Sequence, residues 1–200
     1  MSKKSAILLI FIILLIDQIS KIYIKTHFQL GESVEVFNWF KILFIENDGM
    51  AWGLEIPGDY GKIILTLFRV VAIVAISYWL NKSIKEKAAP VLVLSVALIL
   101  AGAIGNIIDS IFYGLIFDES YGQIASLFAE QAYGELLKGR VVDMLYFPIY
   151  EDVLPEWFPV WGGEKFKFFE PVFNVADTSI SVGFILLLIF NKKAFPKKDS

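Results

Sequence analysis

Residues 6–16, A-I-L-L-I-F-I-I-L-L-I, form an uninterrupted apolar block that is followed at once by D-Q-I-S-K, residues 17–21. With its mostly apolar continuation to Ile24, the segment reaches the roughly 20 residues that a helix needs to cross a hydrocarbon core. Lys3 and Lys4 precede it, as they would precede a signal peptide, but no small-residue cleavage motif follows. We therefore interpret it as a retained membrane helix.

Three further apolar stretches, at about residues 60–80, 90–112 and 173–190, have similar lengths. Of the 200 residues 56% are apolar and the mean hydropathy is +0.63, whereas soluble domains are about 45–50% apolar. The sequence thus predicts an all-α polytopic membrane protein with four transmembrane helices, at about 6–24, 60–80, 90–112 and 173–190. We expect a single membrane-embedded domain over residues 1–200.

Charge separates the two sides of this predicted bundle. Nine lysines lie in the N-terminal tail, the connection around residues 81–89 and the C-terminal tail, with only Glu86 and Asp199 as acids there. Residues 25–59 carry six acids and two lysines, and residues 110–172 carry ten acids and four cations. The positive-inside rule then places both termini in the cytoplasm and the loops 25–59 and 113–172 outside.

Both external loops show local patterns. Residues 33–37 (SVEVF) and 40–46 (FKILFIE) are typical of short strands, and Asn47–Gly49 (NDG) is a turn signal, so we expect a small sheet at the membrane surface. In the second loop, apolar residues recur at helical spacing, which predicts an amphipathic surface helix. They are Ile124, Leu127, Phe128, Ala132 and Leu136.

The composition excludes several chemistries. There is no cysteine, and the single histidine, His27, is expected at the outer end of the first span. Thiolate sites, disulfides and a His-rich zinc site are therefore not expected, and we predict neither a metal nor a cofactor. The net charge of −3 gives no indication of a nucleic-acid partner.

Charged groups inside a bilayer cost at least about 2.5–3.5 kcal/mol each, so those in the predicted spans call for an explanation. Asp17 and Lys21 share one helix face, either as a self-neutralising pair or as the wall of a polar cavity. Asn106 and Asp109 share a face of the third span. At the start of the fourth span Asn174 and Asp177 do the same, although Asn174 could simply cap the helix.

Two further charges lie in apolar surroundings. Asp143, within the apolar run V-V-D-M-L-Y-F, should have a raised pKa unless a partner compensates, or it could lie on a surface strand in water. Arg69 is about nine residues inside the second span, and we expect it to pair with an acid at similar depth, such as Asp17. The acids and amides together predict a polar pocket that opens outward.

Aspartates that share a site cannot both ionise easily, so one of them keeps a proton near neutral pH. A carboxylate that takes a proton from water, beside a carboxylic acid that donates one, is an apparatus for hydrolysis without metal, His or Cys. Intramembrane acids also form proton relays, so a small proton-coupled membrane transporter is the alternative function. A transporter should have polar residues in the cytoplasmic half of its helices, and that half is apolar here.

Five segments in order resemble the lipoprotein signal peptidases, the bacterial signal peptidase II family. They are DQISK from Asp17, ENDGMAWG with Asn47 and Gly49, GAIGNIID ending at Asp109, VVDM with Asp143, and FNVADTSIS with Asp177. The resemblance implies an aspartic endopeptidase of the bacterial cytoplasmic (inner) membrane. It would cut the signal peptide from diacylglyceryl-modified prolipoproteins just before the lipidated cysteine, and would act as a monomer among membrane lipids.

The same resemblance implies roles for individual residues. The catalytic pair would be Asp143 and Asp177. The supporting and substrate-binding residues would be Asp17, Lys21, Asn47, Gly49, Asn106, Asp109, Arg140 and Asn174. The first-loop sheet would be a cradle for the substrate, and the second-loop helix a lid.

The sequence departs from the family pattern at Ser110, where an arginine usually follows the aspartate of the third motif. Arg140 or Arg69 is expected to supply the missing charge. The connection from Asp109 to Asp143 is also unusually long, which predicts an enlarged lid.

Overall fold

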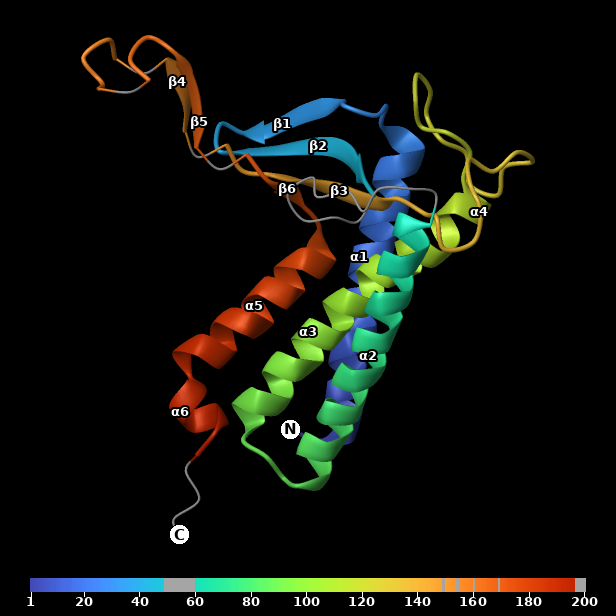
Figure 1. Cartoon of the computed structure of the whole chain (residues 1–200), viewed down its shortest axis with the longest axis vertical. Coiled ribbons are helices and arrows are strands. Elements are labelled where there is room, and N and C mark those ends of the chain that lie inside the picture. Colours follow the sequence, from blue (N-terminus) through green and yellow to red (C-terminus); the bar gives the residue numbers. More distant parts are fainter. Residues whose placement is uncertain (49–59, 149, 154, 160, 169, 197–200) are drawn as a thin grey trace.

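A computed structural model describes residues 1–48, 60–148, 150–153, 155–159, 161–168 and 170–196. Four apolar helices extend in one direction from a small sheet (Figure 1). They are α1 (Lys3–His27), α2 (Gly61–Lys85), α3 (Pro90–Ile108) and α5 (Val175–Ile189), with the short α6 (Asn191–Ala194) after α5.

The helix boundaries follow from local chemistry. Ser2 caps α1 by accepting the backbone N–H of Ser5, and Pro90 occupies the first turn of α3, where its missing N–H costs nothing. After Ile108 the third helix widens into the π-helical turn η2 (Asp109–Tyr113) and ends as α4 (Gly114–Ile116). Such π-turns frequently occur at functional sites.

The sheet has four antiparallel strands in the order β1-β2-β3-β6. Its strands are β1 (Ser33–Phe37), β2 (Phe40–Asn47), β3 (Val141–Tyr146) and β6 (Val172–Phe173). The two first-loop strands are thus confirmed, and β3 joins them from the second loop. A separate hairpin, β4 (Tyr150–Val153) and β5 (Lys165–Phe168), which the sequence did not predict, forms an arm. The β-structure of the molecule therefore extends beyond the small first-loop sheet that the sequence predicted beside the helices.

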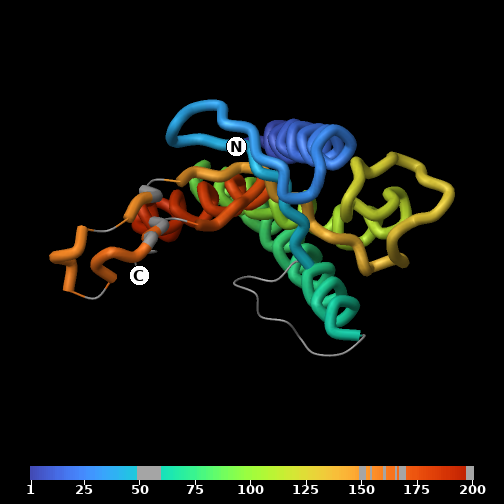
Figure 2. Tube along the Cα trace, turned by 90° about the horizontal axis from the view of Figure 1, so that it is seen from above, coloured from blue at the N-terminus to red at the C-terminus, as the bar shows by residue number. Residues whose placement is uncertain are grey.

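The predicted amphipathic helix over residues 124–136 is wrong, because the described backbone from 117 to 140 is not helical. Its N–H groups instead bind carbonyls at the end of the third helix: Gly139 to Ser110, Leu137 to Ile111, and Gly134 to Gly114. Phe128 and Leu137 adopt positive φ, which a helix does not allow. A side chain at Gly139 would collide with the backbone of Asp109. The loop can therefore lie this close to the π-helical turn only because residue 139 is a glycine. Viewed from above, this loop and the β4–β5 arm project on opposite sides of the helices (Figure 2).

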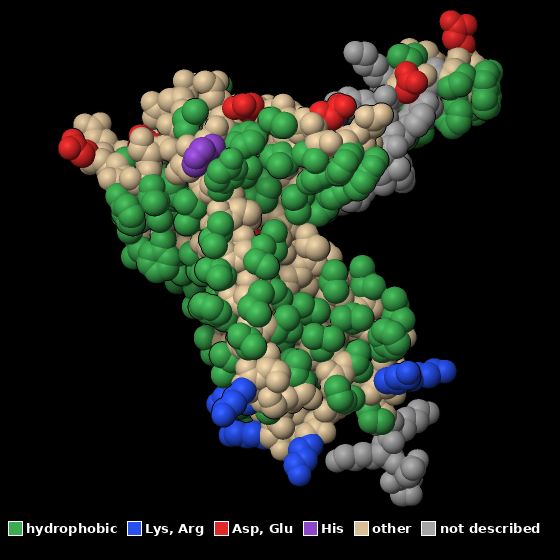
Figure 3. All heavy atoms as spheres, turned by 180° about the vertical axis from the view of Figure 1, so that it is seen from behind, with side chains coloured by type: hydrophobic (Ala, Val, Ile, Leu, Met, Phe, Trp, Pro, Cys, Tyr) green, Lys and Arg blue, Asp and Glu red, His purple; other side chains and the backbone are tan. Residues whose placement is uncertain are grey.

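Length and hydropathy identify three helices among the described residues that could span a membrane: Lys3–His27, Gly61–Lys85 and Pro90–Ile116. The fourth apolar helix, Val175–Ile189, has 15 residues and falls short of the predicted span of 173–190. On the face shown in Figure 3, apolar side chains are spread along the helices, with lysines at the end far from the sheet and acids at the sheet end. This surface is that of a membrane protein.

Candidate active site

The predicted site residues gather where the helices meet the sheet. The first motif forms the buried floor: Asp17 and Lys21 are ion-paired at 3.0 Å, and the Lys21 ammonium lies 2.8 Å from Asp109 and 2.9 Å from the Asn106 carbonyl oxygen. The side chains of Asp17, Lys21 and Asp109 are fully buried. The intrahelical pair expected from the sequence is therefore present, and it continues onto α3.

Gln18 completes this floor, although the sequence reading passed over it. Its amide nitrogen donates to Asp17 at 3.1 Å, to Asp109 at 2.9 Å and to the carbonyl of Gly105 at 3.2 Å. The feature of the sequence that could have identified Gln18 is its position next to Asp17 in the first motif. Gly105 lets α1, α3 and α5 meet here, because a Cβ at that position would lie 2.7 Å from the Asp17 carboxylate and 3.0 Å from the Ala176 side chain.

Asp177 lies in the first turn of α5. Asn174 and Asp177 form a reciprocal capping box: Asn174 Oδ1 accepts the Asp177 N–H at 2.8 Å, and Asp177 Oδ2 accepts the Asn174 N–H at 3.3 Å. Asn106 donates to the other oxygen of Asp177 at 2.7 Å. Both oxygens of the Asp177 carboxylate therefore accept a hydrogen bond at the N-terminus of α5.

Asp143 lies on β3 and is only 3% exposed, so it is not a surface aspartate in water. Asn174 Nδ2 donates to its Oδ1 at 2.8 Å, and Asn47 Nδ2 lies 3.4 Å from its Oδ2. Burial, and next the negative charge of Asp177, raise the pKa of Asp143 to about 7. The capping residue Asn174 thus contacts both aspartates, so its capping role and its place in the site are compatible.

The two arginines differ from expectation. Arg69 does not pair with Asp17; its guanidinium lies 3.5 Å from the hydroxyl of Ser110, and its charge acts on Asp177. Arg140 instead binds Glu46 at 3.0 Å and Glu119 at 2.6 Å, outside the aspartate pair. Of the two candidates for the charge missing at Ser110, Arg69 is therefore the one beside the site. Gly49 lies outside the described residues.

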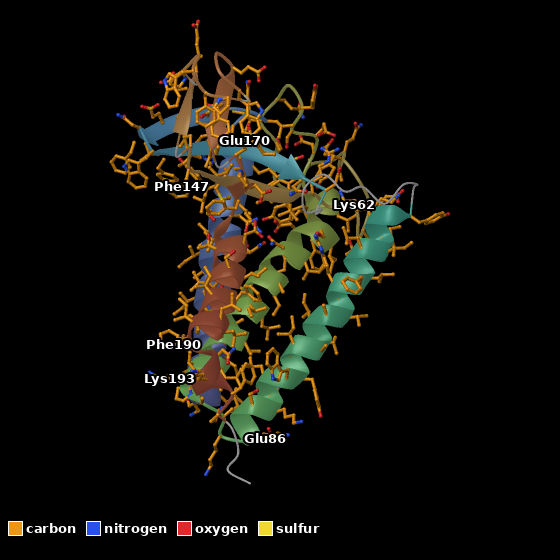
Figure 4. All side chains as sticks on the ribbon, turned by 60° about the vertical axis from the view of Figure 1, so that its left-hand side comes forward. Lys62, Glu86, Phe147, Glu170, Phe190 and Lys193 are labelled. Carbon is orange, nitrogen blue, oxygen red and sulfur yellow. The ribbon has the colours of Figure 1, made fainter. Side chains whose placement is uncertain are left out.

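The sheet end of the molecule carries the site, and the far end carries none of its residues. Lys62, Phe147 and Glu170 mark the sheet end, while Glu86 and Lys193 mark the opposite end of the helices (Figure 4). The described residues hold no cluster of three or more His, Cys, Asp or Glu side chains suited to a metal ion. The polar groups of the site are instead satisfied by one another.

Comparison with known proteins identifies the class. A solved structure described as a bacterial membrane enzyme superposes with a TM-score of 0.66, covering 99% of this chain and 94% of the other at 23% identity, and it shares this fold. A second such structure gives a TM-score of 0.64 at 25% identity, covering 96% of each chain. The molecule is thus a membrane-embedded protein with the fold of known bacterial membrane enzymes.

The family follows from the sequence relatives. The model of signal peptidase (SPase) II matches residues 9–192. A lipoprotein signal peptidase of Porphyromonas gingivalis is 52% identical over 90% of this chain and 80% of its own length, and one of Amoebophilus asiaticus is 36% identical over 90% and 73%. The chain belongs to the signal peptidase II family and is therefore a protease.

Proposed function

We propose that Asp143 and Asp177 are the catalytic dyad of an aspartic endopeptidase. One observation supports this above the others: Asn174 joins the two carboxylates, because its side-chain amide donates to Asp143 and its backbone N–H donates to Asp177. The charge of Asp177 also helps to keep the buried Asp143 protonated near neutral pH. One acid and one base side by side are what hydrolysis without a metal requires.

The surroundings of the two aspartates indicate which one acts as the base and which one as the acid. Asp177, with two donors and a helix N-terminus, is the ionised base that takes a proton from water as the water oxygen attacks the scissile carbonyl carbon. Asp143 donates its proton to the carbonyl oxygen. When the C–N bond breaks, the proton held by Asp177 passes to the leaving amine, and Asp143 recovers a proton from the diol. Both aspartates then have their starting protonation.

We propose a diacylglyceryl-modified prolipoprotein as the substrate, cut before its lipidated cysteine. The relatives bear the name lipoprotein signal peptidase. The site supports the same substrate, because it lies where apolar helices give way to the sheet. A signal-peptide helix among the apolar helices would place its outer end, and the acyl chains anchored next to it, at this level.

The orientation follows from charge. We propose that α5 also crosses the membrane, giving four spans, since its 15 residues cover about 22 Å and the chain continues through α6. Both termini would then be cytoplasmic and the site would lie near the outer face of the bacterial inner membrane. We expect the enzyme to work as a monomer surrounded by lipid.

The test uses the full chain, purified in detergent, with a diacylglyceryl-modified prolipoprotein. Asp143→Asn and Asp177→Asn should each reduce cleavage roughly 10²–10⁴-fold, the usual contribution of a positioned acid or base. Asp152→Asn, at an exposed aspartate of β4, is the matched control and should cleave normally. Substantial cleavage by either folded dyad variant would refute the proposal.

A further inference from the structure

A second buried ionic cluster lies on the sheet, apart from the aspartate dyad. It consists of Lys25 of α1, Glu46 of β2, Ser120 and Arg140. Lys25 forms an ion pair with Glu46 and donates to Ser120 at 2.7 Å, Ser120 donates to Glu46 at 2.7 Å, and Arg140 donates to Glu46 at 3.0 Å. The side chains of Lys25 and Glu46 are 1% and 2% exposed. We call this the Lys25–Glu46 cluster.

Stability alone is a weak explanation for such a cluster. Moving charges out of water offsets most of their mutual attraction, so a buried ion pair is often no more stabilising than apolar side chains of equal size. Burial, the largest single influence, raises the pKa of Glu46, but the Lys25 charge and the hydrogen bonds from Lys25, Ser120 and Arg140 together bring it below its usual value, so Glu46 is an anion at neutral pH. The cluster thus keeps Glu46 charged at a buried position, where an isolated charge would be energetically unfavourable.

The position of Glu46 in the chain indicates what the charge does. Glu46 directly precedes Asn47, whose amide lies against Asp143. In the sheet Glu46 pairs with Val142, the neighbour of Asp143, and Asn47 pairs with Val141. Arg140 directly precedes β3, so the cluster fixes the adjoining ends of both strands.

The strand needs that anchor because its register is interrupted. Between Ile42 and Ile45 the pairing of β2 with β3 shifts by one residue. The pairing with β3 at the beginning of β2 therefore does not fix the pairing at its end. A slip by one residue would turn the Asn47 side chain to the opposite face of the sheet.

We propose that Glu46 is a positioning residue: held by Lys25 and Arg140, it fixes the end of β2 so that Asn47 contacts Asp143. This inference rests on the proposed function, in which Asp143 is catalytic. Glu46 acts through Asn47, because its own hydrogen bonds run to Lys25, Ser120 and Arg140 and not to either aspartate.

A double-mutant cycle tests the link. Glu46→Gln keeps the size of the side chain and removes its charge, and Asn47→Ala removes the contact with Asp143. Each should lower kcat roughly 10- to 100-fold, the scale of a small misplacement at an active site, with little change in KM. Because Glu46 acts through Asn47, the double variant should lose no more activity than Asn47→Ala alone.

The pH profile provides a second readout that a purely structural role would not change. The hydrogen bond from Asn47 lowers the pKa of Asp143. Loss of that bond should therefore let Asp143 keep its proton to higher pH, and the alkaline limb of kcat/KM should move upward in Glu46→Gln and Asn47→Ala alike. Glu135→Gln is the control, since it removes an exposed ion pair with Lys138 in the same part of the chain.

If Glu46→Gln does not fold, Lys25→Met/Glu46→Leu removes both buried charges and should fold, with the same loss in kcat and the same shift of the alkaline limb. Additive losses in the cycle, or an unshifted pH profile in the folded variants, would overturn the positioning role. The dyad proposal fails separately, through residual cleavage by Asp143→Asn.

Discussion

The carboxylate of Asp17 in α1 accepts the backbone N–H of Ala176, the residue before Asp177, at 2.8 Å. Asp17 thus binds the first turn of α5 with one oxygen, while its other oxygen contacts Lys21 at 3.0 Å. The first helix of the chain therefore holds the start of the last long helix, 159 residues away in sequence.

The Asp17–Ala176 link predicts a graded response. Asp17→Ala leaves Lys21 with less compensation and should lower the free energy of unfolding by about 3–5 kcal/mol. Asp17→Asn keeps an oxygen that can accept the Ala176 N–H and should lose less. Thermal unfolding in one detergent compares the two, and equal losses would show that the hydrogen bond to Ala176 contributes nothing.

Close packing at Gly105 gives a second prediction. Gly105→Ala would place a methyl group 2.7 Å from Asp17 and 3.0 Å from the Ala176 side chain, so it should destabilise the protein by about 1–3 kcal/mol. Gly134→Ala is the control, because its new methyl group would be 3.6 Å from the nearest atom, an ordinary contact. Thermal unfolding should separate the two variants, and equal melting temperatures would contradict the packing argument.

The raised pKa of Asp143 predicts that stability depends on pH. Because the pKa is 3.8 in the unfolded chain and about 7 in the folded one, the folded state binds the proton more tightly. The contribution of Asp143 to the free energy of unfolding should therefore be highest below about pH 4 and fall by up to about 4 kcal/mol as pH rises through 7.

Asp143→Asn cannot ionise, so it should match the wild type near pH 4 and exceed it in stability at pH 8. Melting temperatures at the two pH values measure the difference, with Asp152→Asn as an exposed control. A variant that is less stable than the wild type at both pH values would contradict the assignment of this pKa.

Arg69 gives the fourth prediction. Its guanidinium lies 3.5 Å from the Ser110 hydroxyl, and its charge acts on Asp177. Arg69→Met should lower kcat/KM roughly tenfold, equivalent to about 1.4 kcal/mol of transition-state stabilisation, and Arg69→Lys should retain most of the activity. Lys82→Met, which removes an exposed cation at the far end of the same helix, is the control and should cleave normally. Equal activity of Arg69→Met and Lys82→Met would contradict a role for the Arg69 charge.

The parts that could be predicted from the sequence depend on contacts within one element. The spacing of Asn106 and Asp109, and of Asn174 and Asp177, placed each pair on one helix face, and strand patterns located β1 and β2. The parts that could not be predicted depend on partners far away in sequence. Residues 124–136 have helical spacing but form no helix, because N–H groups of this loop bind backbone carbonyls at the end of the third helix instead.

The same reason explains the missed cluster. Lys25 continues the helix face of Asp17 and Lys21, and Glu46 directly precedes a motif residue, so both signals were present. Neither signal indicated the other residue, because Lys25 and Glu46 lie 21 residues apart on different elements, α1 and β2. Likewise, the local sequence could not distinguish Arg69 from Arg140 as the cation beside the dyad.

Lys21 has a further consequence for the chemistry of the site. A protonated lysine has three N–H bonds, and this one has three acceptors, Asp17, Asp109 and Asn106, at 2.8–3.0 Å. Every donor is thus in use, so the nitrogen could reach a water molecule or a peptide carbonyl only by giving up an existing partner. All three donors of this buried lysine are occupied, so in the proposed mechanism the proton transfers fall to Asp143 and Asp177 alone.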